Sequence, residues 1–117
     1  MRIPIAYALS WPERIKVSTP RLDLAKMKTL HFSEIEDARF PALGLARAAL
    51  AEGAAHCIAF NAANEVAVGR FLNGEIEFTK IATTIESILA ATQNNPISSI
   101  DDIFACDRTA REAAQNL

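Results

Sequence analysis

Three polar side chains within an apolar stretch are the first residues of this sequence that could do chemistry. Asn61, Asn64 and Glu65 stand at positions i, i+3 and i+4 among alanines and valines, so a helix would carry two amides and a carboxylate on one face. Such a face could bind a polar ligand. It could also bond to free backbone groups of neighbouring loops and fix one packing of an alanine-rich core. Because buried polar groups need hydrogen-bond partners, we interpret the three residues as a structural polar network.

The histidines and cysteines form no pattern that is typical of catalysis or of metal binding. His56 and Cys57 are adjacent, so on a helix they point in different directions and cannot face each other as base and nucleophile. His31 has no His or Cys partner at the spacing of metal ligands. We therefore predict no catalytic residue and no metal ligand in this chain. Cys57 and Cys106 are expected to be buried, reduced thiols of a cytosolic protein.

Two further patterns argue against an enzyme site within these residues. Asp101 and Asp102 follow serines at a predicted helix start, where carboxylates are favourable, so we do not interpret them as a general acid/base pair. The four glycines make neither of the glycine-rich motifs that hold phosphate groups.

The charge distribution excludes some classes of partner. The net charge of the 117 residues is −2, which disfavours a nucleic-acid-binding surface. No apolar run is long enough to span a membrane, so we predict no membrane association. Residues 1–40 have a net charge of +2 and residues 41–117 a net charge of −4, which suggests two regions with different surroundings.

Apolar periodicity predicts a mainly α-helical fold. From Pro41 onwards, four amphipathic stretches with short connections indicate a helical bundle. The expected helices cover residues 41–52, residues 56–73, residues 79–93 with Thr79 as N-cap, and a stretch that begins near Ser98 or Ser99.

The segment before Pro41 is predicted to lie outside that bundle. Pro4, Pro12 and Pro20 interrupt regular structure, and one short helix fits between the first two. Residues 12–29 are predicted to form an extended, basic, proline-containing connector, and residues 30–32 one short strand that would need a partner elsewhere.

Several stretches together resemble the C-terminal part of 1-deoxy-D-xylulose 5-phosphate (DXP) reductoisomerases. The resemblance covers nearly the whole chain in order, and its two most specific blocks are MRIPIA at residues 1–6 and NAANE at residues 61–65. Further matching stretches are WPER at 11–14, LHF at 30–32, RFPAL at 39–43 and ARE at 110–112.

This resemblance implies a parent enzyme of known activity. Members of the family use NADPH and magnesium or manganese to convert DXP to 2-C-methyl-D-erythritol 4-phosphate in non-mevalonate isoprenoid biosynthesis. They are cytoplasmic homodimers with a dinucleotide-binding domain, a catalytic domain and a C-terminal helical bundle. By this resemblance residues 1–10 end the catalytic domain, residues 11–36 form a linker, and residues 37–117 form the bundle.

The family's cofactor, metal and substrate-phosphate residues have no counterpart here. Met1 alone is expected at the edge of the cofactor or substrate pocket, and no NADPH or metal is expected to bind this chain by itself. The chain is therefore expected to be structural and inactive alone, with the upstream domains as its partners. The alternative is a free-standing helical module that binds another protein through the segment before Pro41.

Overall fold

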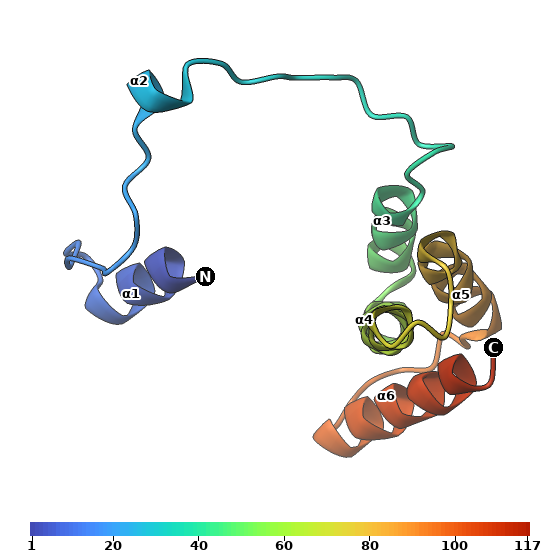
Figure 1. Cartoon of the computed structure of the whole chain (residues 1–117). Helices are drawn as coiled ribbons and strands as arrows, with labels where there is room; N and C mark the ends of the chain where they lie inside the picture. The colour runs from blue at the N-terminus through green and yellow to red at the C-terminus, as the bar shows by residue number, and fades with distance from the viewer. The chain divides into compact units, whose positions relative to one another are not determined.

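The computed structural model describes all residues from 1 to 117 and contains six α-helices and no β-strand. The chain divides into two compact units, Met1–Glu34 and Ile35–Leu117, which are described separately. The first unit holds α1 (Arg2–Ser10) and α2 (Leu24–Met27). The second holds α3 (Ala42–Glu52), α4 (Ala54–Leu72), α5 (Phe78–Ala91) and α6 (Ile100–Gln115), all labelled in Figure 1.

The predicted four-helix bundle is confirmed, and α4 is its central element. Helix α4 packs against each of α3, α5 and α6, and Figure 1 shows it end-on with the other three around it. Alanines dominate its buried face, and isoleucines of α5 and alanines of α6 complete the core. The core consists of Ala59, Ala62, Ala63, Val66, Ile85, Ile88, Ala110 and Ala114.

The connections around α4 are short because glycines occupy the left-handed region of backbone space. Gly53 alone separates α3 from α4, with a φ of 117°, and Gly74 has a φ of 76° in the turn after α4. A side chain would strain the backbone at either position. The helices predicted over residues 41–52 and 56–73 are thus confirmed, with ends that differ by at most two residues.

The predicted N-cap of α5 is wrong. Helix α5 begins at Phe78, and its N-cap is Glu77, which makes no side-chain capping bond. Thr79 therefore lies inside the first turn. The reason is that α5 is placed by its apolar stripe, with Ile85 and Ile88 buried, rather than by a capping hydroxyl.

The start of α6 is fixed by a reciprocal capping box. The Ser99 hydroxyl accepts a hydrogen bond from the Asp102 backbone N–H at 3.1 Å, and the Asp102 carboxylate accepts one from the Ser99 backbone N–H at 2.8 Å. Ser98 donates two more bonds to the same carboxylate, from its N–H and its hydroxyl, both at 3.0 Å. Three of these four contacts satisfy backbone N–H groups at the start of α6, and the fourth comes from the Ser98 hydroxyl.

The same bonds change the acidity of Asp102. Hydrogen bonds from the Ser98 backbone, and then from Ser99 and the Ser98 hydroxyl, lower the pKa of the Asp102 carboxyl from 3.8 to about 2. Because this pKa is depressed in the folded state, the stabilisation is present above pH 3.8 and is lost as the pH falls toward 2.

The first unit has no core of its own. No residue in Met1–Glu34 is buried, and the only long-range side-chain bond in this unit runs from the Arg2 guanidinium to the Ser18 carbonyl at 3.3 Å. Helix α1 confirms the predicted short helix, whereas α2 lies within the predicted extended connector. Asp23 starts α2 by accepting bonds from the N–H groups of Ala25 and Lys26, a cap that the sequence prediction overlooked.

The strand predicted at residues 30–32 is wrong. These residues carry no strand assignment and no backbone hydrogen bond to another segment. A single strand gains its bonds only from a neighbour, and the chain contains no other strand. The apolar residues Leu30 and Phe32 on either side of His31 are therefore not sufficient to form a strand.

The capping box yields the first prediction. Replacement Ser99→Ala removes the acceptor for the Asp102 N–H, so we expect the free energy of unfolding to fall by about 1 kcal/mol. The measurement is urea unfolding followed by helical circular dichroism. Ser87→Ala is the matched control, because the Ser87 hydroxyl only bonds back to the Thr83 carbonyl within α5. Equal effects of the two substitutions would show that the cap does not stabilise α6.

Candidate functional site

Two of the three predicted network residues belong to an ion-pair chain that joins α4 to α6. The Asn61 amide donates to the Glu65 carboxylate at 3.2 Å within α4. The Arg111 guanidinium of α6 donates to the same carboxylate at 2.7 Å and to the Asp107 carboxylate, one turn earlier on α6, also at 2.7 Å. The chain therefore runs from Asn61 through Glu65 and Arg111 to Asp107.

Asn64 is not part of this chain. Its side chain is half-buried and makes no hydrogen bond to another residue. Asn61 and Glu65 are exposed, so the network lies at the surface of α4 rather than within the core. Among the polar stretch, the buried positions are held by Ala62, Ala63 and Val66.

The network predicted from the sequence did not include Arg111 and Asp107. Their i, i+4 spacing on one helix was a visible signal for an ion pair. The contact between Arg111 and Glu65, which are 46 residues apart, had no such signal, because it depends on how α6 packs against α4.

Hydrogen bonds within the ion-pair chain favour the charged forms of Glu65 and Arg111. Hydrogen bonds from Arg111, and then from Asn61, hold the pKa of the Glu65 carboxyl below its ordinary value of 4.5. Bonds to Asp107 and Glu65 raise the pKa of Arg111 above its ordinary value. The guanidinium and the two carboxylates hold one another in their charged forms across α4 and α6, so this arrangement suits bracing of the two helices.

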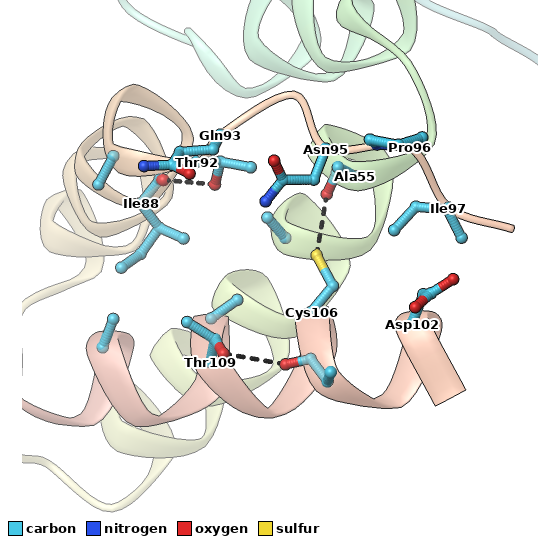
Figure 2. A pocket seen from close by; sticks show the side chains of 15 residues that line it. Ala55, Ile88, Thr92, Gln93, Asn95, Pro96, Ile97, Asp102, Cys106 and Thr109 are labelled. Carbon is cyan, nitrogen blue, oxygen red and sulfur yellow. Dashed lines mark hydrogen bonds between the residues drawn. The ribbon is translucent and has the colours of Figure 1, made fainter. Parts of the chain in front are cut away.

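A groove of the bundle lies between α4, α5, α6 and the connector after α5. It has a volume of about 470 Å³, and Figure 2 shows its lining side chains. Alanines make up much of the surface, with Ile88, Pro96 and Ile97 among the larger apolar residues. The groove is therefore mainly apolar.

The polar groups of this groove are largely bonded to backbone. The Thr92 and Thr109 hydroxyls donate to carbonyls of their own helical turns, at 2.8 and 2.9 Å, and the Cys106 thiol lies 3.6 Å from the Ala55 carbonyl (Figure 2). These contacts leave the groove without a convergent set of reactive groups.

The cysteines differ from their predicted burial. Cys57 is exposed and Cys106 is half-buried, so the prediction of two buried thiols is wrong, although both thiols are free. Cys57 is exposed although its thiol lies 3.6 Å from the Ala49 carbonyl of α3, and its neighbour His56 takes the buried position. The His56 ring is buried, with no partner for Nδ1. Burial of Cys106 raises the pKa of its thiol, with a smaller contribution from Asp107.

The remaining candidates are the predicted pocket-edge residue Met1, a metal site and a membrane-spanning helix. Met1 precedes α1 and is 91% exposed. No group of three or more His, Cys, Asp or Glu side chains lies together as metal ligands would. No helix has the length and apolarity needed to cross a membrane.

The ion-pair chain yields the second prediction. We expect Arg111→Gln to lower the thermal unfolding midpoint at pH 7 by a few degrees at most, because the Arg111 side chain is 37% exposed and the pairs are screened by salt. The effect should shrink in 1 M salt. It should also shrink progressively as the pH falls from 4.5 through the lower pKa of Glu65 in the folded state, because protonation then removes the charge of the carboxylate.

Arg108→Gln is the matched control for this measurement. Arg108 is exposed on the same helix and has no carboxylate within ion-pair distance, so the same charge change should leave the midpoint nearly unaltered. If the two variants have the same thermal unfolding midpoint at every pH and salt concentration, the ion-pair chain does not couple α4 to α6.

Comparison with known proteins identifies the family. The family model for the DXP reductoisomerase C-terminal domain matches residues 1–113. The 1-deoxy-D-xylulose 5-phosphate reductoisomerase of Burkholderia multivorans is 47% identical over 117 residues, which are 100% of this chain and 29% of that protein. The enzyme of the same name from Bradyrhizobium sp. strain ORS 278 is 48% identical over 121 residues, covering 100% of this chain and 30% of that protein.

Solved structures agree with the sequence relatives. The reductoisomerase from Zymomonas mobilis in complex with NADPH has a TM-score of 0.82 at 38% identity, covering 97% of this chain and 30% of that one. A DXP reductoisomerase in complex with NADPH, fosmidomycin and magnesium has a TM-score of 0.81 at 35% identity, covering 98% and 30%.

The chain spans about 30% of the length of these relatives. The family model matches nearly every residue, the relatives are close in sequence, and the solved structures share the same bundle. The chain therefore belongs to the DXP reductoisomerase family, in which it corresponds to the C-terminal domain.

Proposed function

We propose that this chain is the C-terminal part of an enzyme that reduces and rearranges DXP to 2-C-methyl-D-erythritol 4-phosphate. The observation that carries the proposal is the match to the family's C-terminal domain over residues 1–113, at 47% identity to a named reductoisomerase. The parent would use NADPH and magnesium or manganese, in line with relatives solved with NADPH and magnesium. It would act in isoprenoid biosynthesis as a cytoplasmic homodimer.

The residues of this chain do not fit the cofactor or the metal. The metal would need a group of carboxylates or imidazoles, and no such group is present here. NADPH would need a phosphate-binding turn, and none of the four glycines belongs to such a motif. We therefore assign both sites to the part of the parent that precedes this chain, and we leave Met1 as a residue at the pocket edge.

Within the parent we assign residues 1–10 to the end of the catalytic domain, residues 11–36 to a linker and residues 37–117 to the bundle. Support for the first assignment comes from α1, whose Ile3, Ile5 and Leu9 side chains are 56%, 52% and 83% exposed. A nine-residue helix with no buried side chain lacks the packing that holds most short helices. The catalytic domain would provide that packing.

The bundle contributes structure rather than chemistry in this proposal. Its polar residues Asn61, Glu65 and Arg111 are bonded to one another, and its groove has no convergent reactive groups. A rigid bundle would hold the end of the catalytic domain through the linker. The chain alone should therefore be inactive.

The third prediction tests this proposal with the complete reading frame that contains this chain. The purified full-length protein should oxidise NADPH, followed by its near-ultraviolet absorbance, only when DXP and Mg²⁺ are both present. The isolated chain should give no signal under the same conditions, and adding it to the separately made upstream part tests whether the pieces act together.

Two results would contradict the proposal. A folded full-length protein without DXP-dependent NADPH oxidation would refute the activity. Oxidation by the isolated chain would refute the assignment of the chemistry to the upstream part. A frame that starts at Met1 would favour the alternative, a free-standing protein-binding module.

A further inference from the structure

A buried histidine near the start of α4 lacks the hydrogen bonds that buried polar groups normally make. His56 is 9% exposed, and its Nδ1 atom is the one enclosed side-chain nitrogen or oxygen without a partner in the chain. Buried polar atoms nearly always have such a partner, and a neutral imidazole has one nitrogen that accepts and one that donates. The residues of the chain therefore do not account for the hydrogen-bonding capacity of this ring.

The histidine lines a cleft where the end of α3, the start of α4 and the end of α5 meet. The cleft has a volume of about 380 Å³, which is more than one water molecule fills. Its lining residues are Ala48, Ala49, Glu52, His56, Leu89, Ala90, Thr92 and Asn94. Half of them are apolar, and a few polar groups stand among them, which is the usual composition of a site for a small molecule.

The polar groups of this cleft mainly accept hydrogen bonds. The Thr92 hydroxyl already donates to the Ile88 carbonyl at 2.8 Å, and the Asn94 amide donates to the Glu52 carbonyl at 3.0 Å. The oxygens of the Thr92 and Asn94 side chains can still accept, and the Glu52 carboxylate forms no ion pair. No lysine or arginine lines the cleft. These groups favour a ligand that donates hydrogen bonds and carries a positive charge.

We propose that the cleft between α3, α4 and α5 is a binding site for a small organic ammonium ion. The ammonium group would donate to the His56 imidazole and to the Glu52 carboxylate, and a short apolar part would lie against Ala49 and Leu89. A metal ion fits less well, because only two side chains of the kinds that bind metals strongly, Glu52 and His56, line the cleft. The proposal uses residues of the second unit alone and does not depend on the activity of the parent enzyme.

The fourth prediction concerns titration of the 117-residue chain with propylammonium, followed by the magnetic resonance signals of the His56 ring. These signals should shift and reach saturation as the ammonium ion fills the cleft. Propan-1-ol has nearly the same size and no charge, so it should bind about fivefold more weakly. Ring signals that do not change with propylammonium would show that water alone fills the cleft and would overturn the proposal. Equal affinity for the two compounds would overturn it too, because the site would then be a general apolar cavity.

Two variants with the same change of charge test the role of the carboxylate. Glu52→Gln keeps the size of the side chain and should weaken propylammonium binding about fivefold, while binding of propan-1-ol stays the same. Glu86→Gln is the matched control, because Glu86 is exposed on α5 and does not line the cleft. Equal weakening by the two substitutions would reduce the effect to the overall charge of the bundle and would refute the site.

A variant of the histidine tests the second contact. His56→Ala removes the imidazole, so its affinity for propylammonium, measured by calorimetry, should fall toward its affinity for propan-1-ol. Helical circular dichroism shows whether this variant remains folded, and undiminished binding by a folded variant would refute the proposed contact. Should the variant unfold, Glu52→Gln still decides, because Glu52 is exposed and its replacement leaves the core intact.

Discussion

Close contact through small side chains on α4 is the constraint on which the bundle depends. Ala59, Ala62, Ala63 and Ala67 are at most 1% exposed, so α4 presents an almost smooth surface to its neighbours. Small side chains let helices approach closely. The short distance between the helices brings many atoms into contact, and dispersion attraction between these atoms stabilises the packing. Ile85 of α5 is the only large side chain with less than 2% exposure. Added volume at Ala62, Ala63 or Ala67, none of which lines the groove, would therefore press on the neighbouring helices.

Because the apolar surface of α4 is smooth, the orientation of the neighbouring helices depends on specific polar contacts. Arg70 of α4 donates to the Ala114 carbonyl of α6 at 2.9 Å, at the end of α6 where positive charge is favourable. Asn94 donates to the Glu52 carbonyl at 3.0 Å and ties the connector after α5 to the end of α3. Together with the ion pair between Glu65 and Arg111, these bonds join segments that are far apart in the sequence. Each is modest in energy, but together they select one packing.

The sequence allowed much of the bundle to be predicted because its signals are local. Apolar periodicity placed all four helices, and glycines or Ser99 marked several of their ends. Predictions that depended on tertiary contacts were less successful. Burial of Cys57, the strand at residues 30–32 and the N-cap of α5 were wrong. The site showed the same division, since Asn61 and Glu65 could be paired from spacing, whereas the partner Arg111 comes from another helix.

The two units differ in whether they bury a hydrophobic core of their own. Residues 35–117 bury a core of their own, whereas residues 1–34 bury no side chain and expose large apolar residues, among them Leu9, Leu22 and Phe32. This difference agrees with a chain that spans about 30% of its relatives' length. The bundle would be a self-sufficient brace, and the first unit the part by which it is joined to the remaining protein.

The most direct test of this account is the free energy of unfolding of Ala63→Val, compared with Ala105→Val. Ala63 is fully buried on α4 and Ala105 is exposed on α6, so the two substitutions share the same loss of helix propensity but only one adds volume to the core. If close contact at the α4 alanines holds the bundle together, Ala63→Val costs about 1–3 kcal/mol more than Ala105→Val in urea unfolding. Equal costs would contradict it, because the bundle would then tolerate larger side chains where α4 meets its neighbours.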